Sequence, residues 1–427
     1  MMSSTHKSPV WHPFTQHAVT PEPLAIKRAS GAHIFTTDDR SIIDAISSWW
    51  VITHGHCHPK IMAAIKQQAE HLDQVIFAGF THEPAEVLAR ELLTLTPEGL
   101  THVFYSDSGS TAVEVALKMA LSHFHNLGQK RTRILALEHA YHGDTVGTMA
   151  AGARGVFNAA YQPLLYDVAR VPFPQAGKEQ VTFDAIEAAC RTADVAALIV
   201  EPLILGAGGM LTYSATALAE MARIARHHGA LFIADEVMTG WGRTGTLFAC
   251  EQAGVSPDLL CTAKGLTGGA IPLAATLATE EIFTSHYSND RNKTFFHSSS
   301  YTANPIACAA AVANVDIWRN EPVRERIGNL VEMQRHNLAA ISSDNAFTNA
   351  RQIGTITAID IAVPDGGYLA GIGPKLQRQF LAQGVLLRPL GNTVYVMPPY
   401  CISSDDLAQV YSAIRSGEEA TRAELQP

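Results

Sequence analysis

Several features that define other classes of protein are missing from this 427-residue sequence. Met1–Lys7 has no apolar core of the kind that a secretory signal requires, and the apolar stretch near Ala303–Val315 is too short and too interrupted by asparagine to span a bilayer. Basic residues are outnumbered, with 31 Lys and Arg against 40 Asp and Glu, so no basic face for nucleic acid is expected. The sequence therefore predicts a cytoplasmic protein that binds neither membranes nor nucleic acid.

Cysteine is scarce, and its six occurrences show no paired spacing, so we expect reduced thiols rather than disulfides. The segment His54–His58 holds three histidines and a cysteine, but four ligands within five residues cannot all face one ion, and no second cluster accompanies them. Gly206–Gly209 lacks the Gly-x-Gly-x-x-Gly spacing in front of a helix. These patterns argue against a metal site and against a dinucleotide site.

What the sequence does contain is a regular alternation of helical and strand patterns between Pro59 and Ala303. This alternation predicts an α/β fold, with a mixed, mostly parallel sheet flanked by helices. The expected helices are Lys60–Leu72, Glu86–Leu95, Thr111–His125 and Thr216–His228, and the expected strands are Ile134–Leu137, Val195–Val200, Leu231–Ala234, Leu259–Thr262 and Leu273–Thr279.

The two ends of the chain predict a second, smaller α+β domain. The first 45 residues are proline-rich and then strand-like. After Asn304 we expect one long helix to about Ser342, then a strand at 355–360, a helix near 374–383, two more strands and a final helix from Asp405. The expected division is 1–58 for the N-terminal part of the small domain and a wall of the ligand site, 59–310 for the large domain, and 311–427 for the rest of the small domain.

Two ionisable residues mark the ends of two predicted buried strands. Asp235 ends the first, and Lys264 follows the second with no other charge nearby, so burial would favour its neutral, nucleophilic amine. An aspartate and a lysine presented at the carboxyl edge of a sheet suit a cofactor with a pyridine nitrogen and an aldehyde, pyridoxal 5'-phosphate (PLP). The alternatives are a solvated lysine and an aspartate that caps a loop.

Two further stretches suit the same cofactor. Ser106–Thr111 opens a helix with Gly109 and Ser110, whose backbone N–H groups and hydroxyl could cradle a phosphate; the alternative is a helix N-cap alone. Tyr141 follows the strand Ile134–Leu137 and could stack on a planar ring; the alternative is a half-buried loop aromatic.

Seven motifs, in this order along the chain, resemble those of the fold-type I, class III aminotransferases, which use PLP. They are Ser108-Gly109-Ser110, Tyr141-His142-Gly143, Glu201-Pro202, Asp235-Glu236, Gly242-Arg243-Thr244-Gly245, Lys264-Gly265 and Asn304-Pro305. The resemblance implies a homodimer with active sites shared between subunits. It also implies that Lys264 forms the Schiff base, Asp235 contacts the pyridine nitrogen, Gly109 and Ser110 hold the phosphate, and Tyr141 stacks on the ring.

Within that class, Trp11–Thr15, Ser47–Trp50 and Leu387–Pro389 resemble the branch that forms 7,8-diaminononanoate for biotin synthesis. The resemblance implies S-adenosylmethionine as amino donor and 8-amino-7-oxononanoate as acceptor, in a ping-pong reaction through pyridoxamine phosphate. Class III enzymes that act on ω-amino acids, ornithine or diamines, and members with lysine as donor, are the alternatives.

The acceptor is a long aliphatic chain that ends in a carboxylate, so it requires an apolar wall and a cationic partner. Phe14, Trp49 and Trp50 are the predicted wall, and Arg388 is the predicted carboxylate partner, with a structural ion pair as its alternative. The remaining predicted substrate contacts are Tyr141, Arg243 and Tyr395.

Three positions depart from the pattern that the resemblance implies. Phe14 stands where many members have tyrosine, and Leu205 stands where glutamine is common. Ser298–Ser300 replaces the usual segment that ends in threonine, so Ser300 is expected to make the phosphate contact that the neighbouring subunit supplies in this class. The first two departures bear on how the amino donor is bound.

Overall fold

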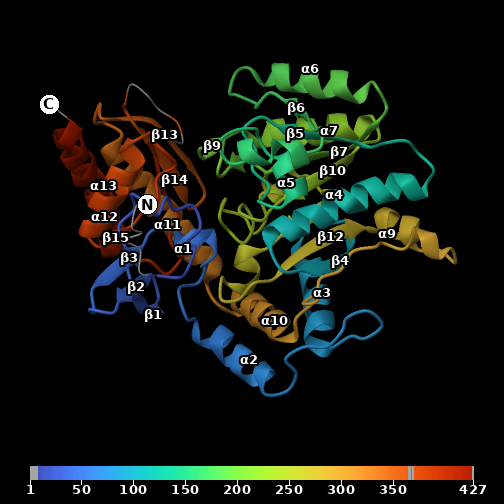
Figure 1. The fold of residues 1–427 in the computed structure, drawn as a ribbon, viewed down its shortest axis with the longest axis horizontal. Coiled ribbons are helices and arrows are strands. Elements are labelled where there is room, and N and C mark those ends of the chain that lie inside the picture. Colours follow the sequence, from blue (N-terminus) through green and yellow to red (C-terminus); the bar gives the residue numbers. More distant parts are fainter. Residues whose placement is uncertain (1–7, 364–366, 368–369, 426–427) are drawn as a thin grey trace, which may run out of the picture.

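The computed structural model describes residues 8–363, 367 and 370–425, so Met1–Lys7 lies outside the described residues. Figure 1 shows a larger body built around a central sheet and a smaller body in which the two ends of the chain lie together. Within the described ranges, no helix is both long enough and apolar enough to cross a membrane.

The larger body is organised by a seven-stranded sheet with the order β4-β12-β11-β10-β7-β5-β6. β12 pairs antiparallel with both of its neighbours, and the pairs from β11 to β6 are parallel. The strands are β4 (Leu100–Ser106), β12 (Ala274–Thr279), β11 (Leu259–Thr262), β10 (Leu231–Asp235), β7 (Val195–Val200), β5 (Arg133–Leu137) and β6 (Ala169–Val171). The predicted mixed, mostly parallel sheet is confirmed, and the carboxyl ends of its parallel strands meet at one edge.

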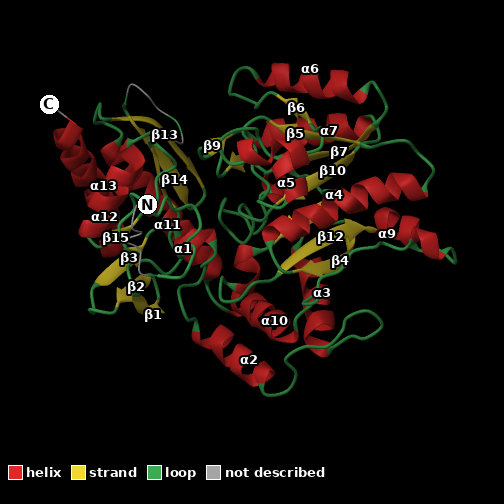
Figure 2. Ribbon diagram, in the orientation of Figure 1, coloured by secondary structure: helices red, strands yellow, loops and turns green. Residues whose placement is uncertain are grey.

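The central strands are continuous apolar runs because both faces of the sheet are covered by helices (Figure 2). On β10, Ile233 packs into the core cluster of α4 (Gly109–Asn126), whereas Phe232 packs into that of α7 (Ala215–His227). The other helices of this body are α2 (Pro59–Ala69), α3 (Glu83–Leu95), α5 (Val146–Ala151), α6 (Glu179–Cys190), α8 (Cys250–Ala253), α9 (Glu280–His286) and α10 (Pro305–Asn320).

The smaller body joins the two ends of the chain in one sheet. Its order is β1-β2-β3-β15, in which β15 (Val385–Leu386) pairs parallel with β3 (Ser41–Asp44). A second sheet has the order β13-β14-β16, and three helices accompany it. The other elements of this body are β1 (Ile26–Ser30), β2 (His33–Thr36), α1 (Ser47–Trp50), β13 (Phe347–Ile353), β14 (Ile356–Ile361), β16 (Thr393–Val396), α11 (Val323–Ile341), α12 (Ile372–Ala382) and α13 (Ser404–Leu425).

The long helix expected from Asn304 to Ser342 is two helices. α10 ends at Asn320 and α11 begins at Val323, because Pro322 lacks the N–H that would continue the helix and disfavours helical geometry at Glu321. The expected domain boundary after residue 310 therefore falls inside α10, which packs against α2 and α3 of the larger body. We propose that the boundary lies instead at the break between α10 and α11.

Candidate active site

A cavity of about 530 Å³ lies at the carboxyl edge of the central sheet, where the smaller body faces it. The N-terminus of α4, the segment after β5, the end of β10 and the turn after β11 supply one side, and the chain ends supply the other. All the predicted site residues except Ser300 and Arg243 line it, namely Phe14, Trp49, Trp50, Gly109, Ser110, Tyr141, Asp235, Lys264, Arg388 and Tyr395. Residues far apart in sequence are thus brought to one place.

Lys264 stands two residues beyond the end of β11 in a left-handed backbone conformation, with φ of 46°. Gly265 follows it because a Cβ there would lie 2.6 Å from the Cβ of Trp241. The Lys264 Nζ is 4.5 Å from the ring centroid of Trp50. Burial lowers the pKa of the Lys264 amine to about 8, although Asp235 and Glu201 oppose that shift. A substantial fraction of the amine is therefore neutral near physiological pH.

Burial of Lys264 predicts that the free energy of unfolding of the cofactor-free protein depends on pH. The ordinary pKa of 10.5 falls to about 8 on folding, so between these values the unfolded chain binds the proton and the folded chain does not. Stability should rise with pH through this window, and below pH 8 the full cost of burying the charge, about 3 kcal/mol at most, is present. Lys264→Met should therefore gain stability over the wild type at pH 7, and the gain should shrink by pH 10.

Urea unfolding of the two cofactor-free proteins at both pH values measures this difference. Lys66→Met, at an exposed position of α2, is the matched control for the removal of a lysine. A gain from Lys264→Met that does not change with pH would show that packing, not charge, causes it.

Asp235 is fixed at the end of β10 by two hydrogen bonds. His142 Nδ1 lies 2.7 Å from Asp235 Oδ2, and the Val237 N–H donates to Oδ1 at 3.1 Å. Both side chains are buried, and His142 Nε2 has no hydrogen-bond partner among the residues that the structure describes. His142 lies in one of the motifs found in the sequence, but no role was predicted for it. Its position next to Tyr141, at the same sheet edge, could have indicated that it belongs to the site. The pair holds a carboxylate in place toward the cavity.

Glu201 is a second buried carboxylate that sequence reasoning left without a role. It follows β7 directly and accepts the N–H groups of Tyr141 and Gly206, each at 2.9 Å. Burial raises the pKa of Glu201 to about 7. Glu201 therefore ties the segment that carries Tyr141 to the glycine-rich segment that begins at Gly206.

The N-terminus of α4 forms the predicted cradle and is also a helix cap. Ser108 Oγ accepts the Thr111 N–H at 3.2 Å in a capping box, and the first amides of the helix lie beside the cavity. Gly109 permits this approach, because a Cβ there would lie 2.5 Å from Val237 Cγ1. Ser110 Oγ accepts the Asp144 N–H at 3.2 Å, which fixes the hydroxyl at the same end. Free amides at a helix N-terminus suit a phosphate.

The donor set of this cavity fits PLP. The N-terminus of α4 suits its phosphate, the buried carboxylate of Asp235 suits a protonated pyridine nitrogen, and the amine of Lys264 suits its aldehyde. Tyr141 and Val237 supply flat or apolar surface in the same cavity. In the described part of the chain, no three His, Cys, Asp or Glu side chains gather closely enough to hold a metal ion.

Aromatic side chains form the outer part of the cavity. Phe14 lies 5.6 Å from Trp49 and 6.2 Å from Phe157, measured between ring centroids. Trp50 Nε1 donates to the Tyr395 hydroxyl at 2.9 Å, which fixes the deeper tryptophan. Phe14 and Trp49 are 49% and 41% exposed. Phe157 was not predicted, and its sequence surroundings carried no signal for it.

Arg388 lies over this aromatic wall. Its guanidinium carbon is 5.1 Å from the ring centroid of Trp49, and Nη2 is 3.5 Å from the Phe14 carbonyl oxygen. No carboxylate of the described residues lies within ion-pair distance of Arg388, so the alternative of a structural ion pair is not what the structure shows. The guanidinium can donate hydrogen bonds to a substrate carboxylate.

Arg243 is not where the prediction of a substrate contact placed it. It is 1% exposed, and its guanidinium donates to the carbonyl oxygens of Pro398 and Ile52 at 3.0 and 2.9 Å and lies over the ring of Tyr400. Its hydrogen bonds thus hold together segments of the smaller body behind the cavity. Leu205 is likewise buried and lines neither this cavity nor its neighbour, so its departure from the family pattern does not place it against a ligand.

Ser300 does not line the cavity of its own chain. It is exposed, and its carbonyl oxygen accepts a hydrogen bond from Gln74 at 2.8 Å. The neighbouring Ser299 donates instead to Asp107 Oδ2 at 3.0 Å, and Asp107 does line the cavity. The predicted phosphate contact of Ser300, across a subunit boundary, stays a prediction.

This arrangement of sheet edge, buried lysine and fixed aspartate is that of a PLP-dependent transferase. The chain belongs to the class-III aminotransferase family, whose model matches residues 14–416. The chain is 48% identical to an adenosylmethionine-8-amino-7-oxononanoate aminotransferase from Synechococcus elongatus, over 95% of this chain and 97% of that protein. It is 36% identical to a protein of the same name from Aquifex aeolicus, over 95% and 94% of the two chains.

Solved structures agree with this assignment. A crystal structure of adenosylmethionine-8-amino-7-oxononanoate aminotransferase from Methanocaldococcus jannaschii has a TM-score of 0.91 and 32% identity, covering 96% of this chain and 97% of that one. An amine transaminase from an uncultivated Pseudomonas species, in a PLP-bound form, has a TM-score of 0.91 and 30% identity, covering 97% and 99%. The predictions of an aminotransferase, of its class and of PLP as cofactor are confirmed.

Proposed function

We propose that this aminotransferase moves the amino group of S-adenosylmethionine to 8-amino-7-oxononanoate, giving 7,8-diaminononanoate for biotin synthesis. The observation that carries the proposal is Arg388, which lies over Trp49 beside Phe14 and has no carboxylate partner among the described residues. An apolar wall that ends in a guanidinium without a carboxylate partner among the described residues suits a long aliphatic acid. The names of the relatives support the same pair of substrates.

The proposed roles of the inner residues follow from their placement. PLP supplies an electron sink for a substrate carbon that loses a proton. Asp235, held by His142, would keep the pyridine nitrogen protonated, and the α4 N-terminus with Gly109 and Ser110 would hold the phosphate. Lys264 Nζ, whose pKa is lowered to about 8 by burial, would bind the aldehyde at rest and carry the proton taken from the donor's α-carbon.

The outer residues would receive both substrates in turn. Trp50 is fixed by Tyr395, so it presents a rigid surface beside Lys264. Phe14 and Trp49 would cover the aliphatic chain of the acceptor, and Arg388 would hold its carboxylate. One site that binds two different molecules alternately predicts ping-pong kinetics.

The test of this function is a half-reaction screen of the PLP-loaded enzyme with one amine at a time. S-adenosylmethionine should remove the visible absorbance of the bound cofactor, and 8-amino-7-oxononanoate should then restore it. Lysine, glutamate, ornithine and diamines should act far more slowly. If S-adenosylmethionine fails while another amine succeeds, the proposed donor is wrong.

Arg388→Ala should weaken the acceptor half-reaction about 10- to 100-fold, because a charged hydrogen bond to the substrate carboxylate is lost. The change should appear in KM for 8-amino-7-oxononanoate, measured by stopped-flow titration of the amine-loaded enzyme. Cofactor content should not change. Arg388→Lys keeps the charge but not the planar fork, so its KM for 8-amino-7-oxononanoate should lie between those of the wild type and Arg388→Ala. Equal loss of acceptor and cofactor binding would assign Arg388 a structural role.

We propose in addition that the enzyme is a cytoplasmic homodimer in which Ser300 reaches the partner's phosphate site. Ser300 is exposed and lies away from its own cavity, and Phe296 and Tyr301 of the same segment are 71% and 62% exposed. Large apolar side chains gathered on one segment are typical of a surface that a second chain covers.

A further inference from the structure

A second cavity, of about 400 Å³, adjoins the active-site cavity. The two share part of their lining, including Tyr141, Phe157, Ala207 and Leu390. Half of the lining residues of the second cavity come from two segments that contain glycine, 152–158 and 207–209. It is therefore a side chamber of the site, and the 206–210 segment, of which residues 207–209 line the chamber, forms one wall.

Two contacts with the larger body hold this wall in place, one at its start and one in its middle. The Gly206 N–H donates to Glu201 Oε2 at 2.9 Å. Gly208 packs directly on the segment that carries Tyr141, since a Cβ at Gly208 would lie 2.2 Å from the His139 carbonyl oxygen. The wall and the segment of Tyr141 are consequently one packed unit.

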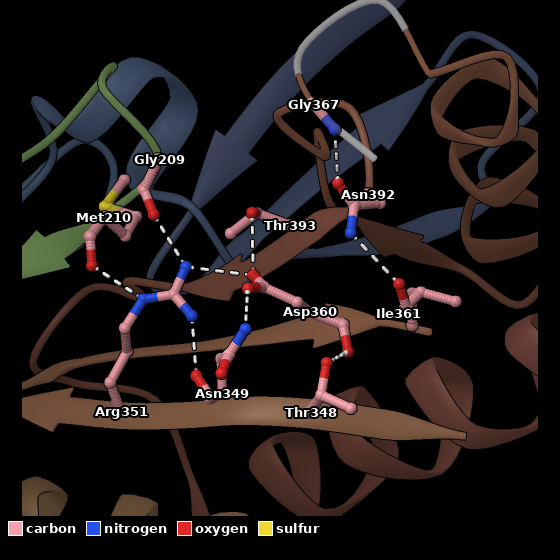
Figure 3. A network of polar contacts seen from close by, with 10 residues as sticks. All are labelled: Gly209, Met210, Thr348, Asn349, Arg351, Asp360, Ile361, Gly367, Asn392 and Thr393. Carbon is pink, nitrogen blue, oxygen red and sulfur yellow. Dashed lines mark hydrogen bonds and ion pairs between the residues drawn. The ribbon is translucent and has the colours of Figure 1, made fainter. Parts of the chain in front are cut away.

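Arg351 of β13, in the smaller body, holds the far end of the wall by hydrogen bonds (Figure 3). Arg351 Nη2 donates to the Gly209 carbonyl oxygen at 2.6 Å, and Nε donates to that of Met210 at 2.8 Å. Two successive carbonyl oxygens are thus fixed by one planar guanidinium, a geometry that lysine cannot reproduce.

The guanidinium is itself fixed by Asp360 of β14. Arg351 Nη2 lies 3.0 Å from Asp360 Oδ1, which also accepts the Thr393 hydroxyl at 2.8 Å, and Asn349 Nδ2 donates to Oδ2 at 3.1 Å. Thr393 lines the side chamber, so the network reaches the chamber from a second direction. Figure 3 shows these side chains converging on the Asp360 carboxylate across the sheet. The side chains of Arg351 and Asp360 are 14% and 17% exposed.

We propose that Arg351 is a positioning residue that sets the 206–210 segment as the wall of the side chamber, and that this chamber receives the nucleoside part of the amino donor. The inference rests on the proposed function. The acceptor is a narrow aliphatic chain that would lie between Lys264 and Arg388, both of which line the first cavity. S-adenosylmethionine carries a ribose and a flat heteroaromatic ring beyond its amino acid end, and that bulk requires further space beside the first cavity. Gly208 and Gly209 add no side chain to the chamber, and Phe157 adds an aromatic ring, which suits such a group.

The test separates the two half-reactions in Arg351→Met and Arg351→Lys, both loaded with PLP. KM for S-adenosylmethionine should rise at least about 10-fold in Arg351→Met, because the wall loses two charge-assisted hydrogen bonds. The half-reaction with 8-amino-7-oxononanoate should stay within about 2-fold of the wild type. Arg351→Lys, which keeps the charge, should recover part of the donor binding.

Calorimetric titration of S-adenosylmethionine in a Lys264→Ala background, with and without Arg351→Met, gives the same comparison without turnover. Arg378→Met, which removes an exposed arginine paired with Glu424 on the far helices of the smaller body, is the matched control and should change neither half-reaction. If donor and acceptor half-reactions fall together in Arg351→Lys, or if donor binding is unchanged in Arg351→Met, the proposal is overturned. Failure of the wild type to use S-adenosylmethionine would instead overturn the proposed function itself, and this inference with it.

Discussion

Lys264→Ala is expected to lower the rate of transamination by at least about 10⁴-fold, the largest effect of any single substitution in this chain. In the proposed function, one amine both binds the cofactor and carries the proton, and no other lysine lines the cavity in the described residues to replace it. Steady-state assays and single-turnover half-reactions with an amino donor measure the loss.

Chemical trapping shows whether Lys264 itself carries the cofactor. Borohydride treatment of the PLP-loaded wild type should attach the cofactor irreversibly to the peptide that contains Lys264, as read by mass spectrometry. The alanine variant should not be labelled in this way. Label on another lysine of the wild type, or near-normal turnover by the variant, would contradict the assignment.

Asp235→Asn is expected to lower kcat by about 10²- to 10³-fold, because a neutral amide cannot keep the pyridine nitrogen protonated and the ring loses its capacity to accept electrons. The side chain keeps its size, and an oxygen remains for the Val237 N–H. The cofactor should still bind through Lys264 and the α4 N-terminus, so cofactor content should change much less than kcat.

The matched comparison for Asp235→Asn is His142→Asn, which removes the partner at 2.7 Å but leaves the carboxylate. Its effect on kcat should be smaller, about 10-fold, because the charge is retained and only its orientation is loosened. If His142→Asn is as damaging as Asp235→Asn, or if Asp235→Asn acts only by releasing the cofactor, the proposed role of the carboxylate is wrong.

The fold was most predictable from sequence where burial is uniform. β7 and β11 have the predicted bounds, because a strand covered on both faces is a continuous apolar run between polar ends. β4 was not predicted, since Thr101 and His102 interrupt its apolar run and its residues range from exposed to buried. The break between α10 and α11 was not predicted from the sequence. Pro322 marks that break, but the helical pattern continues on both sides of it.

The site was predictable where chemistry sits at strand ends, and not where it depends on tertiary contacts. Asp235 and Lys264 were placed by the carboxyl-edge rule for parallel sheets. The pairing of His142 with Asp235 joins residues 93 positions apart, and no local pattern reports it. Arg243 was predicted to contact the substrate, but its guanidinium donates instead to carbonyl oxygens of Pro398 and Ile52, which are distant in sequence.

The pairing of β15 with β3 also fixes the order in which the protein can be completed. Ala45 donates to the Leu386 carbonyl oxygen at 3.2 Å, and Met397 donates to that of Ala45 at 2.8 Å, so the N-terminal segment is anchored by residues made some 340 positions later. The larger body has its sheet strands between residues 100 and 279 and can form earlier in synthesis. Trp49 and Trp50, next to this anchor, can take their places only after the C-terminal strands have left the ribosome. A nascent chain would therefore hold the lysine and the aspartate in place before the aromatic wall exists, and selectivity for substrate would be the last property to arise.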